Sequence, residues 1–161
     1  MAYTELKSAD KQALKTYINA NYAALVTQQD YSAIADALNL ASSGPAVNGW
    51  MTSVGAQVID EASNWTAFDT MSAGKRDSWK MFFAFSRDFS RGKVRSWVTD
   101  IWGAATAGSN AESILLATVE PATVAEVVVG GATRATGTVS ALDRKWIGRI
   151  SVYDIGGILA S

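Results

Sequence analysis

The sequence predicts a mainly α-helical protein, a compact bundle of six or seven short helices with one small β-hairpin near the C-terminus. Apolar residues recur at helical spacing along most of the chain. Residues that cap helices stand before several of these segments, and β-branched residues gather in one late region. The 161 residues fit a single domain over 1–161. Within it, the hairpin and the final helix at about 133–161 form a candidate interaction appendage.

Two helices are expected before residue 45. The first carries a mostly apolar face between Leu14 and Leu25, at spacings of three and four residues. The second runs from Tyr31 to Leu40, and Asp30 before it is a candidate N-cap. Gly44-Pro45 then predicts a loop.

The middle of the chain predicts three helices that begin at serine or threonine. Thr52 or Ser53 begins a short helix, Ser72 begins a second, and Ser90 begins the clearest helix in the chain. Gly103 is the natural stop of that clearest helix. Its apolar face consists of Val94, Trp97, Val98, Ile101 and Trp102.

Two capping-box patterns mark helix starts late in the chain. Ser109 with Glu112 is the first, and Ser151 with Asp154 begins a short final helix. Between them, Pro121 stands where the first residue of another helix is expected, because proline suits that position.

The hairpin is expected in the region between these helices. Segments 136–140 and 145–150 are rich in β-branched and aromatic residues. Residues 141–144 lie between the two segments, so we expect them to form the turn.

The composition excludes several kinds of chemistry. The chain contains neither cysteine nor histidine, which removes disulfides, thiol catalysis and the commonest general base and metal ligand. No phosphate-binding loop follows any of the glycine pairs, and Ser72 with Lys75 is better explained by a helix cap than by acyl transfer. We therefore expect a non-enzymatic protein with no catalytic residues, cofactor or metal.

The chain also lacks the signals of membrane insertion or export. No apolar run approaches the roughly 18 residues of a membrane helix. The first residues are polar and acidic where a signal peptide would be apolar. We therefore expect a soluble protein, made in the cytoplasm.

Charge is distributed unevenly, although the net charge is only −1. Residues 16–74 contain five acidic residues and neither lysine nor arginine, whereas residues 75–95 contain seven basic residues and two acidic ones. Half of all basic residues thus lie in one short segment, which calls for an explanation.

Three interpretations of this charge map stay open. The two segments neutralise each other within one molecule, or the acidic face of one copy meets the basic face of the next in a ring or filament. Alternatively, the basic segment binds nucleic acid, although the sequence pI near 5.4 and the core-like spacing of its aromatic residues disfavour this. Those aromatic residues are Trp79, Phe82, Phe83, Phe85, Phe89 and Trp97.

Six residues are candidates for a protein interface. Arg91 and Arg95 are expected opposite the apolar face of the clearest helix. Trp50 in a loop and Trp146 on the hairpin are hard to bury in a small fold, and exposed tryptophan is enriched at interfaces. The full candidate set is Arg87, Arg91, Lys93, Arg95, Trp50 and Trp146. In contrast, Trp79, Trp97 and Trp102 are expected in the core.

Several segments resemble small structural proteins of tailed bacteriophages and prophages. They are Gly74-Lys75-Arg76-Asp77-Ser78-Trp79, Ile101-Trp102-Gly103, Pro121 to Glu126, and Gly148 to Ile155. The similarity covers most of the chain from about Trp50 onward. It implies a virion protein without enzymatic activity, a head–tail connector, tail or capsid-surface component that forms a homo-oligomeric ring and contacts other virion proteins. The alternative is a small cytoplasmic adaptor or regulator that binds a protein or nucleic acid.

Overall fold

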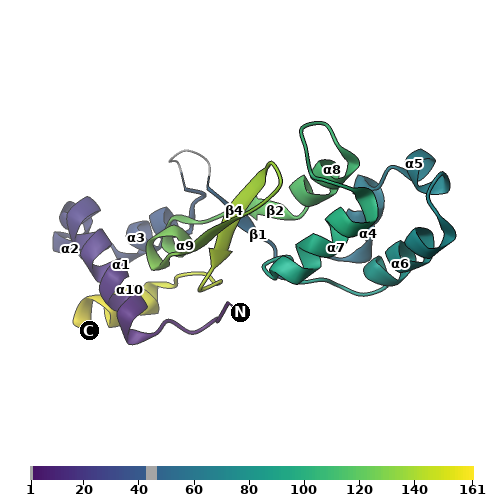
Figure 1. Cartoon of the computed structure of the whole chain (residues 1–161). Coiled ribbons are helices and arrows are strands. Elements are labelled where there is room, and N and C mark those ends of the chain that lie inside the picture. Colours follow the sequence, from purple (N-terminus) through teal and green to yellow (C-terminus); the bar gives the residue numbers. More distant parts are fainter. Residues whose placement is uncertain (1, 43–46) are drawn as a thin grey trace. The chain divides into compact units, whose positions relative to one another are not determined.

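The computed structural model describes residues 2–42 and 47–161 (Figure 1). Over these residues the chain forms ten helices and a four-stranded mixed sheet, which is an α+β fold. The predicted bundle with one small hairpin is therefore wrong, because the hairpin is only part of a larger sheet. The loop predicted at Gly44-Pro45 lies outside the described residues.

The chain forms two compact units, each built from separate segments. Unit 1 combines Met1–Val47, Pro121–Ala132 and Arg144–Ser161, and unit 2 combines Asn48–Glu120 and Thr133–Asp143. The range 133–161, expected to act together as an appendage, is thus divided between the units at residue 144. The single-domain organisation stays a prediction.

Unit 1 is helical and has its own apolar core. Its helices are α1 (Ser8–Asn21), α2 (Ala23–Thr27), α3 (Tyr31–Asn39), α9 (Val124–Val129) and α10 (Val152–Ala160). Leu14, Ile18, Ile34, Leu38, Trp146, Ile155 and Ile158 are among the buried side chains that fill this core.

Helix starts in unit 1 follow the local sequence closely. The Asp30 side chain accepts a hydrogen bond from the Ala33 N–H, so Asp30 is the N-cap of α3. Ser151 and Asp154 form a reciprocal capping box at the start of α10. Both predictions are confirmed. In contrast, Pro121 ends a strand, and α9 begins three residues later with Thr123 as its cap.

Unit 2 contains the other five helices and a second apolar core. They are α4 (Ala56–Ala62), α5 (Trp65–Asp69), α6 (Ala73–Phe83), α7 (Gly92–Trp102) and α8 (Asn110–Leu116). The core gathers large aromatic and aliphatic side chains, among them Trp50, Ile59, Trp79, Phe82, Phe89, Val98, Ile114 and Leu115. Gly103 ends α7 with a positive φ of 92°, as its sequence predicts.

The sheet has the strand order β2-β1-β4-β3. Its strands are β1 (Asn48–Trp50), β2 (Val119–Pro121), β3 (Gly131–Thr136) and β4 (Val139–Arg144), most of whose residues belong to unit 2. β1 pairs in parallel with β4, and Gly49 lies opposite Leu142. Strands far apart in sequence are thus joined at the centre of the sheet.

The β-hairpin lies earlier in the chain than predicted. Its turn is at Gly137 and Thr138, between β3 and β4, and Gly137 has a left-handed φ of 61°. Residues 141–144, the predicted turn, lie inside β4. The segment 145–150 forms no named strand, because its apolar side chains Trp146 and Ile150 pack into the core of unit 1.

Candidate functional site

Three of the six candidate interface residues are buried. Trp50 is 0% exposed, Trp146 is 2% exposed and Arg95 is 3% exposed. The indole of Trp50 donates to the Arg134 carbonyl at 3.1 Å, and that of Trp146 donates to the Thr4 carbonyl at 2.9 Å. The expectation that the two tryptophans are hard to bury is therefore wrong, since each has a core to enter and a polar partner for its N–H.

Arg95 holds the segment before α7 instead of facing solvent. Its guanidinium donates to the carbonyl oxygens of Phe89 and Ser90, the latter at 2.8 Å, and to the Thr136 hydroxyl at 3.1 Å. It also lies over the Trp50 ring, 4.6 Å from the centroid. The expected exposure of Arg95 is wrong, because α7 turns this residue toward the sheet and its aromatic core.

The charge of Arg95 is compensated by Asp143 on β4. The two groups lie 3.4 Å apart, and Arg134 lies 3.6 Å from the other carboxylate oxygen. Burial lowers the pKa of Arg95, opposed by the nearby Asp143. Burial likewise raises the pKa of Asp143, opposed by the two arginines. This arrangement is a structural clamp between α7 and the hairpin.

The other three candidates lie on one side of unit 2. Arg91 and Lys93 are exposed at the start of α7, and Arg87 is half-buried in the segment between α6 and α7. Arg91 forms an ion pair with Asp88 at 3.1 Å. The Lys93 side chain makes no hydrogen bond or ion pair within the described part of the chain.

Exposed apolar side chains surround these basic residues. Met81 is 68% exposed, Phe85 is 71% exposed and Trp97 is 40% exposed. We name the set of Met81, Phe85, Arg87, Arg91, Lys93 and Trp97 the aromatic–basic surface. Soluble proteins seldom expose several large apolar side chains in one patch, and such patches mark interaction sites.

Arg87 connects the aromatic members of this surface. Its guanidinium carbon lies 5.8 Å from the Phe85 ring centroid and 5.5 Å from that of Trp97, within the range of cation–π attraction. The same group donates to the Met81 carbonyl at 2.9 Å and to the Phe82 carbonyl. Both carbonyls belong to the last turn of α6. Arg87 is therefore held in place before any partner arrives.

A hollow of about 380 Å³ adjoins the exposed tryptophan. It is lined by Arg91, Lys93, Val94, Ser96, Trp97 and Asp100. Val94 and Trp97 give this lining its apolar part, and its charged members are two cations and one carboxylate, Asp100. A hollow of this kind accommodates an apolar side chain of a partner while the rim attracts a carboxylate.

The exposure of the aromatic members differs from what the sequence predicts. Phe85 and Trp97 continue an apolar spacing that is typical of a core. α6 ends at Phe83, however, so that spacing no longer applies at Phe85, and Trp97 packs edge-on against Phe82 at the margin of the core. The side chain of Phe83 lies outside the described part of the structure. The sequence did contain one sign that Phe85 is exposed, because the polar residues Ser86 and Arg87 follow it directly.

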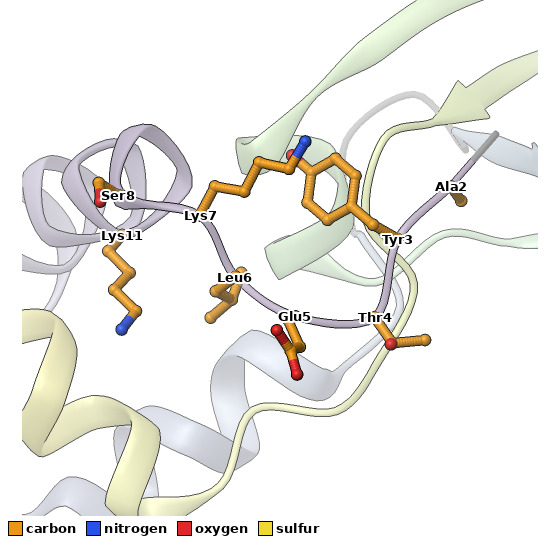
Figure 2. A pocket seen from close by; sticks show the side chains of 8 residues that line it. All are labelled: Ala2, Tyr3, Thr4, Glu5, Leu6, Lys7, Ser8 and Lys11. Atoms are coloured by element: carbon orange, nitrogen blue, oxygen red, sulfur yellow. The ribbon is translucent and has the colours of Figure 1, made fainter.

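A second hollow, in unit 1, is shown in Figure 2. It has a volume of about 680 Å³ and is lined by residues 2–8 and Lys11. Lys7 extends over the Tyr3 ring, 4.1 Å from its centroid, and the Tyr3 hydroxyl donates to Asp10 at 2.7 Å. Burial and the bonded Asp10 raise the pKa of Tyr3. These groups are engaged in fastening the N-terminal segment, so the aromatic–basic surface is the stronger candidate.

Within the described ranges, no helix combines the length and apolar character that crossing a membrane requires. Over the same residues, no three His, Cys, Asp or Glu side chains come together in a group that could hold a metal ion. A scan of protein-family models gives no match, and searches of curated proteins and of solved structures give none either.

Proposed function

We propose that this chain is a non-enzymatic structural protein that binds other proteins through the aromatic–basic surface, as a component of a tailed-bacteriophage particle. The observation that carries the binding role is the exposure of Met81, Phe85 and Trp97 around the fixed guanidinium of Arg87. Aromatic residues, methionine and arginine are the residue types enriched at protein interfaces. The particle itself, with a place at its neck or tail, comes from the sequence resemblance.

Binding of single-stranded nucleic acid is the competing function of the same surface. Exposed Phe85 and Trp97 beside arginine could stack on bases. The surface offers only three basic side chains, and the whole chain is slightly acidic, whereas nucleic-acid affinity depends on neutralising many phosphates. A protein partner therefore suits the surface better.

The test is incorporation into phage particles. Particles induced from the strain that encodes the chain are purified and quantified for the protein by mass spectrometry. Met81→Ser/Phe85→Ser is the surface variant, and Leu40→Ser/Tyr153→Ser is its matched control, with two large exposed residues of unit 1. Removing two interface anchors should reduce incorporation by at least about tenfold.

The expected result is a wild-type protein at constant copy number per particle, an unchanged control and a depleted surface variant. Absence of the wild-type protein from particles contradicts the particle role. Equal depletion of both variants contradicts the role of this surface. Tight, salt-sensitive binding of an oligonucleotide that the surface variant abolishes would favour the nucleic-acid function instead.

A further inference from the structure

Unit 2 carries a second charged surface, opposite in sign to the first. Asp60 and Glu61 near the end of α4 and Asp69 at the end of α5 are exposed, and Trp65 begins α5 between them in sequence. The Trp65 indole donates to the Asp60 backbone carbonyl at 3.1 Å, which fixes the ring at the end of α4, and Asp69 follows one helical turn later. Trp65 is itself 37% exposed. We name these four residues the acidic surface.

The acids of this surface form no ion pair within the described part of the chain. Among the same residues, no ion pair joins an acid of residues 16–74 to a base of residues 75–95. Ion pairs among the described residues include Arg91–Asp88, Arg95–Asp143, Arg134–Asp143 and Arg144–Glu126. Local neutralisation of the two segments within one molecule, one interpretation of the charge map, therefore gains no support from a direct ion pair among the described residues.

The two surfaces complement each other in charge and in apolar content. One presents Arg87, Arg91 and Lys93 together with exposed aromatic rings, and the other presents three exposed acids together with Trp65. Both surfaces lie in unit 2, one on α4 and α5 and the other at the end of α6 and the start of α7. Neither surface can pair with an identical copy of itself, because like charges repel. A second copy of the chain, in contrast, offers a surface of the opposite charge.

We propose that the aromatic–basic surface of one molecule binds the acidic surface of a second copy of the chain, in a head-to-tail contact. Trp65 supplies the apolar side chain for the hollow beside Trp97, and Asp60, Glu61 and Asp69 face its basic rim. Such a contact uses different patches on the two molecules, so it repeats into a closed ring or an open filament. The inference rests on the proposed function, because it identifies the protein that occupies the same surface.

The experiment reverses charge on each surface and then combines the variants. Arg91→Glu/Lys93→Glu makes both surfaces acidic, and Asp60→Lys/Asp69→Lys makes both basic. Molar mass is measured by light scattering after size-exclusion chromatography, at low and high salt, for each variant and for an equimolar mixture. Circular dichroism melts check folding. Lys93→Glu alone is the second basic-surface variant, since the Lys93 side chain makes no hydrogen bond or ion pair within the described residues.

The wild type should form a multimer that high salt dissociates, because exposed charges are screened. Each double variant should be monomeric, with self-association weakened at least about tenfold, and the mixture should regain the wild-type mass. Lys11→Glu/Lys145→Glu, the same charge change in unit 1, is the control and should keep that mass. A monomeric wild type, or a mixture that stays monomeric, overturns the inference.

These outcomes are separable from those of the proposed function. If the wild type is monomeric while Met81→Ser/Phe85→Ser is still depleted from particles, the copy-to-copy contact fails and the protein-binding surface stands. If charge reversal and mixing behave as expected but the protein is absent from particles, the contact stands and the particle role fails.

Discussion

At the scale of single residues, buried charge is the most consequential feature. Arg95 reaches carbonyl oxygens, a hydroxyl, a carboxylate and an aromatic face from one position. In unit 1, Glu126 and Arg144 form a similar buried pair, 3.3 Å apart and each 4% exposed. A buried charge is tolerated only when its hydrogen-bonding capacity is met, and removing one partner leaves the other uncompensated.

Arg95→Met should destabilise the protein by about 3 kcal/mol, because it leaves Asp143 partly buried and frees the Phe89 and Ser90 carbonyls. Arg91→Met, which removes only an exposed ion pair with Asp88, should cost less than about 1 kcal/mol. Urea unfolding at neutral pH measures both. Equal costs for the two variants would contradict the clamp assigned to Arg95.

At the scale of elements, the β3–β4 turn is fastened to the loop before α8. The Thr138 N–H donates to the Ala105 carbonyl at 2.9 Å, and the Thr138 hydroxyl donates to the Glu112 carboxylate. Gly137 approaches so closely that a Cβ there would lie 2.0 Å from the Ala105 oxygen. The hairpin position is thus set by a contact as well as by the turn.

Gly137→Ala should destabilise the protein by more than about 1 kcal/mol, since it adds a clash to the cost of a left-handed φ. Gly108→Ala is the matched control, because Gly108 also has a left-handed φ, of 77°, but a Cβ added there would meet nothing within 4 Å. Thermal unfolding compares them. If Gly108→Ala lowered the free energy of unfolding as much as Gly137→Ala, the close approach to Ala105 would contribute nothing to the cost.

Glu112 gives this contact a pH dependence. Hydrogen bonds from Thr138 and from the Gly108 N–H lower the pKa of Glu112 below its ordinary value of 4.5. The carboxylate therefore stabilises the folded state fully above pH 4.5, and this stabilisation is lost as the pH falls through the lowered folded pKa. The difference in unfolding free energy between wild type and Glu112→Gln should shrink from neutral to acidic pH. A difference independent of pH would contradict this role.

Local sequence predicted helix starts better than it predicted the sheet. Asp30 and Ser151 make their bonds within a few residues, so their patterns can be read directly. β1 and β2 have three residues each, too few to show an alternating pattern, and β1 depends on a partner far along the chain. For the same reason the burial of Trp50 and Arg95 could not be foreseen, whereas Arg91 and Lys93 were placed on the surface correctly.

At the scale of the whole molecule, the chain passes between the two units four times. The crossings follow Val47, Glu120, Ala132 and Asp143. Unit 2 consequently depends on a late segment, 133–143, which supplies Val139 and Ala141 to its core. Neither unit can therefore be cut out of the chain as one continuous segment that contains all of that unit and nothing else.

A fragment of residues 48–143 should retain a cooperative thermal transition, whereas a fragment of residues 48–120 should not. The shorter fragment loses the strand that pairs with β1, the Arg134 carbonyl that accepts from Trp50, and the Asp143 partner of Arg95. Near-ultraviolet circular dichroism reports the packing of the tryptophans. A transition of equal size in 48–120 would show that the hairpin is not required for unit 2 to fold.

The pairing of Gly49 with Leu142 also imposes an order on biosynthesis. β1 leaves the ribosome about ninety residues before the strand that it must join. Until then Trp50 and its aromatic neighbours lack the cover that the hairpin provides, and such exposed apolar segments are what chaperones bind in nascent chains. The same long separation slows closure of the sheet once synthesis is complete, because distant segments must find each other first.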